Sequence, residues 1–154
     1  DETRYRVILH RERRPADWQT FEVMHGAGEE RGHILGEADA ILFDCITMYV
    51  NNMLMDHMKG ITVETLGVSD LTTLQQALEK DLTLMFERIS SVSDKEIIFV
   101  SDELGMGIVP ANAMSRVYRD LVGLANQYVA RRADKVYLSV AGITVELKER
   151  GVEL

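Results

Sequence analysis

The sequence has little cysteine, little proline and no long apolar run. Its one cysteine in 154 residues, Cys45, excludes a disulfide bond within the chain and favours a reducing compartment. The two prolines, Pro15 and Pro110, each end a predicted segment. Because no stretch of about 18 apolar residues and no secretory signal occur, we expect a cytoplasmic protein with no membrane segment.

Basic residues are outnumbered in this chain. It holds 17 Lys and Arg against 25 Asp and Glu, which gives a net charge of −8. Since contacts with nucleic-acid phosphates need a basic face, this balance argues against a general nucleic-acid binder. The apolar content of 46% is ordinary for a globular protein, and the length predicts a single domain over residues 1–154.

The hydrophobic pattern predicts an α/β fold. Short apolar runs at 40–43 and 97–100 are typical of strands in a parallel sheet that are buried on both faces. Apolar residues at helical spacing predict helices over 46–59, 69–89 and 112–132. Further predicted segments are a helix end at 2–10, a short strand at 18–23 and two strand-like runs at 135–142 and 143–148. The alternation of strands and helices indicates a mainly parallel sheet.

Acidic residues follow both predicted central strands. Asp44 closes the first strand, and Asp102 and Glu103 come directly after the second. Ligands of parallel α/β sheets bind beyond the carboxyl ends of the strands, so these positions indicate a site. Asp44 could hold Mg²⁺ beside nucleotide phosphates or cap the following helix, and the sequence favours neither. The loop at 101–110 could shape the rim of the site, lead into a helix capped by Asn112, or do both.

A histidine and three arginines gather in the segment His10–Arg14. Arginine forks match phosphate oxygens, and a histidine beside them could act as a base, a proton donor or a covalent nucleophile. Composition alone favours the alternative, a solvated helix end whose basic residues complement the helix dipole. Glu22 could accept the paired N–H donors on the edge of guanine, although a plain surface charge is favoured without further context.

These residues, taken in order along nearly the whole chain, resemble one family, the bifunctional adenosylcobinamide kinase / adenosylcobinamide-phosphate guanylyltransferase of cobalamin biosynthesis. The most specific stretch is VSDELGMGIVPAN at 100–112. The other matching segments are Asp1-Glu2, His10-Arg11, Arg14-Pro15, Trp18-x-Thr20-x-Glu22, ILFDCIT at 41–47, Tyr118-Arg119-Asp120, Gly123, Asn126-Gln127, Ala133-Asp134 and VAGITVELK at 140–148. An ordered set of this density is far more specific than any single motif.

The resemblance implies a fold, two activities and a set of partners. The implied fold is a P-loop NTPase of the RecA-like kind, with three layers around a mainly parallel sheet. The implied kinase phosphorylates the aminopropanol hydroxyl of adenosylcobinamide with GTP or ATP, and the implied transferase then moves GMP from GTP onto that phosphate. The implied cofactor is Mg²⁺, and the implied assembly is a homotrimer.

The resemblance also implies roles for seven residues. His10 matches the histidine that becomes guanylylated, and it is therefore the predicted catalytic residue. The predicted nucleotide-binding residues are Arg11, Glu12, Arg13, Arg14, Glu22 and Asp44. Among them, Glu22 matches a glutamate near the guanine, and Asp44 matches the acid that orients the metal.

The sequence departs from the family pattern in one major respect, because it contains no glycine-rich phosphate loop ending in Gly-Lys-Ser. Such a loop holds a triphosphate through backbone N–H groups and a lysine. We therefore expect the natural protein to be longer at its amino end, and this chain as written to bind GTP poorly. Two alternatives stay open: a non-catalytic scaffold or binding protein derived from this family, and a kinase without transferase activity.

Overall fold

Two parallel strands form the centre of the fold, as the sequence predicts. The computed structural model describes residues 2–24, 26, 38–60, 68–91 and 95–151. In it, β1 (Ala40–Asp44) pairs in parallel with β2 (Glu96–Val100), and Phe43 lies opposite Phe99. The aliphatic and aromatic residues of both runs suit a pleated strand. The two strands end together, with Asp44 opposite Val100, so the segments that follow them begin at one edge of the sheet.

The two faces of this sheet have different surroundings. Ile41 and Phe43 of β1 are partly buried, and Phe43 and Phe99 pack against the hydrophobic core. On the other face, Leu42 is 44% exposed and Ile98 is 48% exposed. The prediction that both strands are buried on both faces is therefore wrong for the described residues. The reason is that the core helices pack on one face only, which a continuous apolar run does not reveal.

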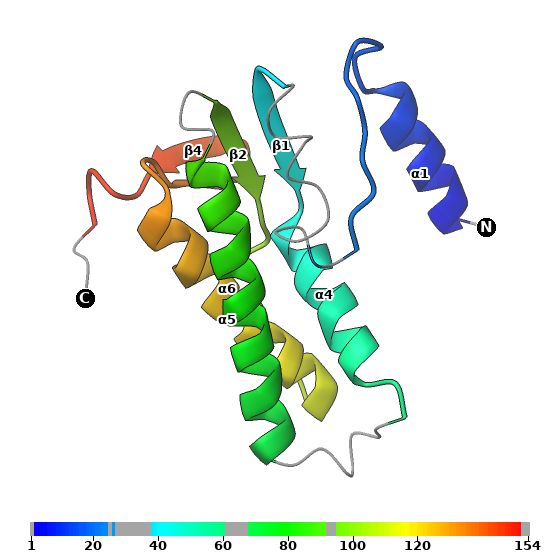
Figure 1. Ribbon diagram of the computed structural model, residues 1–154, viewed down its shortest axis with the longest axis vertical. Coiled ribbons are helices and arrows are strands. Elements are labelled where there is room, and N and C mark those ends of the chain that lie inside the picture. The colour runs from blue at the N-terminus through cyan, green and yellow to red at the C-terminus, as the bar shows by residue number, and fades with distance from the viewer. Residues whose placement is uncertain (1, 25, 27–37, 61–67, 92–94, 152–154) are drawn as a thin grey trace.

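Three helices pack against one another next to the sheet (Figure 1). They are α4 (Ile46–His57), α5 (Val68–Ser90) and α6 (Ala113–Arg132). Each carries an apolar stripe at helical spacing, which confirms the three predicted helices. The buried residues of the resulting cluster are Ile46, Val50, Leu54, Met58, Leu74, Leu78, Leu82, Met85, Leu121, Val122, Ala125 and Val129. The core thus lies where α4, α5 and α6 meet.

An aromatic cluster joins the helices to the sheet. The ring centroids of Phe43 and Phe99 lie 5.6 Å apart across the two strands. Phe99 stacks on Phe86 of α5 at 5.4 Å, and Phe43 meets Tyr49 of α4 edge to face at 5.4 Å. Tyr128 of α6 contacts Phe86 at 5.9 Å. Since each such pair adds about 0.5–1.5 kcal/mol beyond its area burial, the cluster fixes how the helices sit on the sheet.

The amino-terminal segment consists of a helix and an irregular return. The helix α1 (Glu2–Glu12) confirms the predicted helix end and extends it by two residues. The chain then turns at Pro15, whose carbonyl accepts the N–H of Trp18 at 3.1 Å. Residues 18–24 contain no regular secondary structure, so the prediction of a strand over 18–23 is wrong. An alternating pattern does not by itself make a strand, because a strand also needs a neighbour to pair with, and the described residues provide none for this segment.

The carboxyl-terminal strands form a hairpin, β3 (Tyr137–Val140) and β4 (Ile143–Glu146), which pair antiparallel. The connecting residues Ala141 and Gly142 have φ values of 52° and 80°. Positive φ at both central residues belongs to the type I′ turn, whose twist matches that of a two-residue hairpin. The predicted pair of strand-like runs is confirmed, and within the described residues it forms a sheet separate from β1 and β2.

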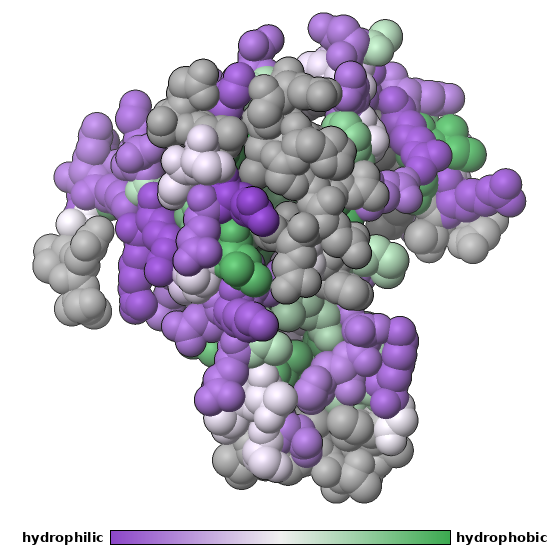
Figure 2. Space-filling view, in the orientation of Figure 1, coloured by the Kyte–Doolittle hydropathy of each residue, from purple (hydrophilic) through white to green (hydrophobic). Residues whose placement is uncertain are grey.

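Polar residues cover much of the surface. Figure 2 shows that hydrophilic residues predominate among the coloured residues of the face in view, with smaller apolar areas among them. Across the described ranges, no helix combines the length and the hydropathy required to cross a membrane.

Candidate functional site

The carboxyl ends of β1 and β2 carry the first group of candidate residues. Asp44 ends β1 and is exposed, and among the described residues its carboxylate has no hydrogen-bond or ion-pair partner. Cys45 follows as the N-cap of α4, and its sulfur accepts the backbone N–H of Met48 at 3.4 Å. Of the two roles left open for Asp44, the capping role therefore belongs to its neighbour Cys45. The carboxylate of Asp44 is left available to a ligand.

A polar network ties these strand ends together. The hydroxyl of Thr47 donates to the carboxylate of Asp102 at 2.9 Å, and the Tyr118 hydroxyl donates to the backbone carbonyl of Thr47 at 2.9 Å. The side-chain amide of Asn126 donates to the Asp102 carbonyl at 3.0 Å and accepts the hydroxyl of Ser101 at 2.6 Å. We call Thr47, Ser101, Asp102, Tyr118 and Asn126 the strand-end network. It connects the start of α4, the end of β2 and one side of α6.

The network makes its surroundings unfavourable for further negative charge. Burial raises the pKa of the Tyr118 hydroxyl above its usual value, and the nearby Cys45 and Asp102 side chains add to the effect. A buried phenolate lacks solvation and is repelled by neighbouring negative groups, so the neutral hydroxyl is favoured. Tyr118 therefore remains a hydrogen-bond donor over the whole physiological pH range.

The loop after β2 is held at both of its ends. The carboxylate of Glu103 accepts the N–H of Gly105 at 2.7 Å and so caps the short 3₁₀ helix η2 (Leu104–Met106). Asn112 caps α6 by accepting the N–H of Ser115 at 3.1 Å, which confirms the predicted cap. Between these points Ile108 is 96% exposed. The loop thus leads into α6, and its middle stays open to solvent beside the strand ends.

A second group of candidate residues lies at the end of α1. Arg11 binds Glu22 at 2.5 Å, and Arg14 donates to the hydroxyl of Thr20 at 3.0 Å. These side chains line an open hollow of about 530 Å³ together with Pro15, Ala16, Trp18 and Phe21. The hollow joins two guanidinium groups, one carboxylate and an exposed indole. Such a set can receive an anionic group and a flat ring.

The structure brings together only some of the predicted nucleotide-binding residues. Arg11, Arg14 and Glu22 share the hollow, whereas Glu12 and Arg13 are exposed and do not line it. His10 lies in α1, and its side chain falls outside the described part of the structure.

Asp44 is separated from this hollow. Figure 1 shows that α1 ends at the level of the amino end of β1, whereas Asp44 closes β1 at its other end. Asp44 is also absent from the lining of the hollow. In this conformation the predicted site is therefore divided between the end of α1 and the strand ends.

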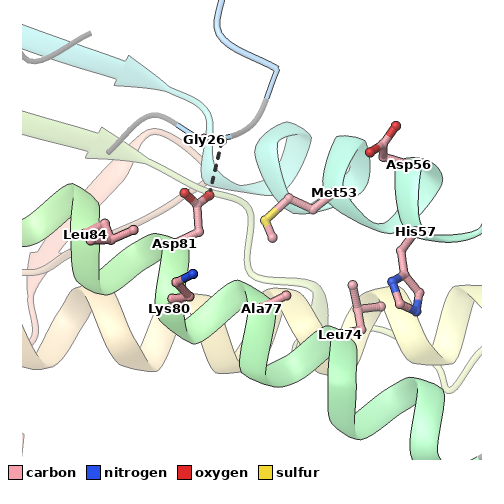
Figure 3. Close-up of a pocket in the computed structure, with 9 residues that line it drawn as sticks. All are labelled: Gly26, Met53, Asp56, His57, Leu74, Ala77, Lys80, Asp81 and Leu84. Carbon is pink, nitrogen blue, oxygen red and sulfur yellow. Dashed lines mark hydrogen bonds between the residues drawn. The ribbon is translucent and has the colours of Figure 1, made fainter. Parts of the chain in front are cut away.

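Another hollow, of about 330 Å³, lies between α4 and α5 (Figure 3). Its lining includes Met53, Leu74 and Leu84, and Asp81 sits at its edge, where it accepts the Gly26 N–H at 3.4 Å and the hydroxyl of Tyr49. None of the predicted site residues lines it. This hollow is therefore not the candidate site.

The residues present fit Mg²⁺ only as a nucleotide-bound ion. Within the described ranges, no three His, Cys, Asp or Glu residues are grouped so as to hold a metal. Magnesium usually needs just one or two carboxylates, with phosphate oxygens and water as its other ligands. The free carboxylate of Asp44 meets that requirement, and the strand end places it where phosphates bind in related sheets.

Comparison with known proteins decides the family. The sequence model described as "Cobinamide kinase / cobinamide phosphate guanyltransferase" matches residues 1–147. The chain belongs to this family. It is 34% identical over 148 residues to the bifunctional adenosylcobalamin biosynthesis protein CobU of Salmonella typhimurium, covering 96% of this chain and 80% of that protein.

Two further relatives agree with this assignment. The CobU protein of Escherichia coli is 30% identical over 148 residues, covering 96% of this chain and 80% of that protein. The bifunctional protein CobP of Pseudomonas aeruginosa is 32% identical over 146 residues, covering 93% of this chain and 73% of that protein. Membership confirms the resemblance read from the sequence, and the mixed α/β fold with its small parallel sheet agrees with it.

Sequence reasoning missed most of the strand-end network. It placed Asp102 near a site without giving it a partner, and it gave Tyr118 and Asn126 no partner either. The available signal was weak: polar residues interrupt the apolar stripe of α6 at positions spaced by about two turns. Only the packing of α6 on the strand ends shows that they meet Thr47 and Asp102.

Proposed function

We propose that this protein acts as a bifunctional adenosylcobinamide kinase and adenosylcobinamide-phosphate guanylyltransferase on a P-loop type, RecA-like fold. Family membership supports an enzyme of this kind, and the relatives are named as bifunctional proteins of adenosylcobalamin biosynthesis. The observation that carries the proposal is the hollow at the end of α1. There Arg11 and Arg14, which closely follow His10 in the sequence, converge with Glu22.

In the proposed transfer, His10 is the nucleophile. A neutral imidazole nitrogen attacks the α-phosphorus of GTP, so an N–P bond forms while the bond to the bridging oxygen breaks and pyrophosphate leaves. An oxygen of adenosylcobinamide phosphate then attacks the same phosphorus, and the N–P bond breaks to restore the imidazole. GMP thus passes to the corrinoid in two displacements, each easier than a direct exchange.

The surrounding residues bind and orient the nucleotide. Arg11 and Arg14 balance the charge of the phosphates, since guanidinium groups pair with two phosphate oxygens at once. Only one oxygen of Glu22 is engaged by Arg11, so its second oxygen remains free to accept N–H groups of guanine. Glu12 and Arg13 complete the predicted nucleotide-binding stretch from outside the hollow.

Asp44 would hold Mg²⁺ beside the phosphates. The residue itself supplies a negative charge at the end of β1, where such an ion can bind. When bound, Mg²⁺ neutralises charge on the phosphate oxygens during transfer. The proposal includes GTP or ATP as phosphate donor in the kinase step, adenosylcobinamide as acceptor, a homotrimeric assembly and a cytoplasmic location.

Labelling of His10 tests the proposal. The natural full-length protein is incubated with GTP labelled at the α-phosphate, and protein-bound label is measured after acid-free denaturation and peptide mapping. We expect label on the peptide that contains His10 and none on the His10→Asn variant. His57→Asn is the matched control, because His57 lines the hollow between α4 and α5 and should leave labelling intact.

The outcomes separate the alternatives. Label retained by His10→Asn would show that the assigned nucleophile is wrong. Phosphorylation of adenosylcobinamide without any protein-bound label would identify a kinase without transferase activity. A protein that neither takes up label nor binds GTP saturably would be a non-catalytic scaffold.

A further inference from the structure

The strand-end network is a closed ring of contacts. The Thr47 hydroxyl donates to the carboxylate of Asp102, and the carbonyl of Asp102 accepts the side-chain amide of Asn126 on α6. The ring returns along α6 to Tyr118, whose hydroxyl binds the carbonyl of Thr47. A closed ring of this kind holds the segments that it joins at a fixed separation. Those segments are the start of α4, where Thr47 lies three residues after the end of β1, the residues that follow β2, and one side of α6.

The side chain of Thr47 is saturated by these contacts. A hydroxyl has one proton and two acceptor sites. Its proton goes to the carboxylate of Asp102 at 2.9 Å, while its oxygen lies 3.4 Å from the Asp102 N–H and 3.1 Å from the sulfur of Cys45. Thr47 is only 2% exposed and is the one fully buried polar residue among those described. Because no water competes for it, its partners determine its position.

Asp44 depends on this anchored turn for its direction. Its carboxylate has no partner of its own within the described ranges, so the backbone from Asp44 to Thr47 determines where this side chain starts and which way its Cα–Cβ bond points. That backbone is fixed at three points: the β1–β2 pairing at Asp44, the Cys45 cap, and the two bonds of Thr47. Of these, the bond from Tyr118 to the Thr47 carbonyl connects the turn to α6.

We propose that the strand-end network is a positioning device for Asp44, with Asp102 as its central positioning residue. By holding Thr47, Asp102 sets the distance and direction of the Asp44 carboxylate relative to a nucleotide-bound divalent cation. This inference rests on the proposed function, since it assumes that Asp44 meets such a cation. It assigns Asp102 no contact with substrate.

Metal binding by Asp102 variants tests the inference. Mn²⁺ serves as the probe, and its binding to the complex of full-length protein and GTP is followed by electron paramagnetic resonance. We expect Asp102→Ala to raise the half-saturating Mn²⁺ concentration about tenfold, the lower end of the effect known for residues that orient metal ligands. Asp102→Asn keeps an oxygen that accepts the Thr47 hydroxyl, and it should restore binding to within about twofold.

A matched variant controls for the loss of a hydrogen bond between elements. The hydroxyl of Thr83 on α5 lies 2.6 Å from the hydroxyl of Tyr128 on α6, and neither residue belongs to the strand-end network. Thr83→Val should lower the melting temperature without changing Mn²⁺ binding. If Asp102→Ala fails to fold, Tyr118→Phe removes only the other bond to Thr47, and it should raise the half-saturating Mn²⁺ concentration in the same direction.

The results distinguish this inference from the proposed function. A wild-type protein that binds no Mn²⁺ in the presence of GTP would overturn both. Wild-type binding that Asp102→Ala and Tyr118→Phe leave unchanged would overturn the positioning role alone. An equal loss in Asp102→Ala and Asp102→Asn would also contradict it, because it would point to the charge of Asp102 and not to its bond with Thr47.

Discussion

At the scale of single residues, acidic side chains that look alike in the sequence have different partners. Asp44 is exposed and has no partner in the described part of the chain, whereas Asp102 accepts the hydroxyl of Thr47. Glu22 pairs with an arginine, and Glu146 accepts three backbone N–H groups. These contacts, and not the residue type, decide which carboxylate can meet a ligand and which serves the fold.

Glu146 is the clearest structural carboxylate. Its oxygens accept the backbone N–H groups of Glu149 at 2.6 Å, Val136 at 3.0 Å and Lys148 at 3.2 Å. The bonds from Glu149 and Val136 are the main reason why the pKa of Glu146 lies below its usual value of 4.5, while desolvation acts in the opposite direction. Bonds to the charged form favour it, so Glu146 clasps the end of the hairpin as a carboxylate.

Removing the charge of Glu146 should make the stability of the fold less dependent on pH. Because the folded-state pKa is lowered, the stabilisation is present above the unfolded value of 4.5 and is lost as the pH falls through the folded-state value. Glu146→Gln should therefore lower the melting temperature near neutral pH. The difference from wild type should shrink as the pH falls below 4.5 and through the folded-state pKa of Glu146. Melting temperatures measured by circular dichroism from neutral pH down through this acidic range test the prediction. Glu149→Gln is the control, and identical pH profiles for the two variants would contradict the assignment.

At the scale of elements, each central strand has a packed face and an open face. Phe99 faces the helices and contacts Phe43 and Phe86, whereas the adjacent Ile98 is 48% exposed. Side chains alternate along a strand, so neighbouring residues of similar hydrophobicity have opposite environments. In the sequence, Ile98 and Phe99 are adjacent members of one apolar run, and nothing in that run distinguishes their environments.

Substitution of these neighbours should show the difference. Phe99→Ala removes contacts from the aromatic cluster and should cost about 3 kcal/mol of unfolding free energy. Ile98→Ala loses mainly strand propensity and should cost about 1 kcal/mol or less. Urea unfolding of both variants measures the two costs. Equal costs would mean that both faces of the strand are packed.

At the scale of the whole molecule, one core holds the chain's long elements together. Leu54 of α4 is 0% exposed and belongs to the cluster that α5 and α6 complete. Leu124 lies on α6, another of the core helices, but this residue is 43% exposed. The same residue type therefore sits at the centre of the core and on its outside.

Leu54→Ala should destabilise the protein by about 2–5 kcal/mol, since it leaves a cavity that the surrounding helices fill only in part. Leu124→Ala should change the unfolding free energy by about 0.5 kcal/mol or less, because exposed substitutions rarely cost more. Chemical denaturation measures both changes in unfolding free energy, provided that the dependence on denaturant concentration has the same slope in each variant. A small effect at Leu54 would contradict the position of the core.

The candidate site also has a feature that appears only at this scale. Arg11 and Glu22 gather at the end of α1, while Asp44 lies at the carboxyl end of β1. A nucleotide that used all three would require these two regions to approach each other.

Much of the fold could be predicted from local patterns. Continuous apolar runs predicted the strands at 40–43 and 97–100. Apolar residues at helical spacing predicted the long helices, because burial repeats with the period of the helix. The strand predicted at 18–23 was wrong, because alternating apolar and polar residues do not supply the partner strand that a sheet needs. The arginines of His10–Arg14 and Glu22 were candidates from the sequence itself, and the family resemblance implied that they bind one nucleotide. The partners of Asp102 were not predicted, because they lie 24 and 55 residues away.

The sequence by itself determined the elements, the acidic strand ends and the family, because all three depend on the identity and spacing of residues along the chain. The tertiary structure alone decided which face of each strand is packed and which carboxylates have partners. It also decided that Thr47 joins the start of α4 to Asp102 after β2 and to Tyr118 of α6. Those features depend on contacts between residues distant in sequence, and such contacts exist only after the helices have packed on the sheet.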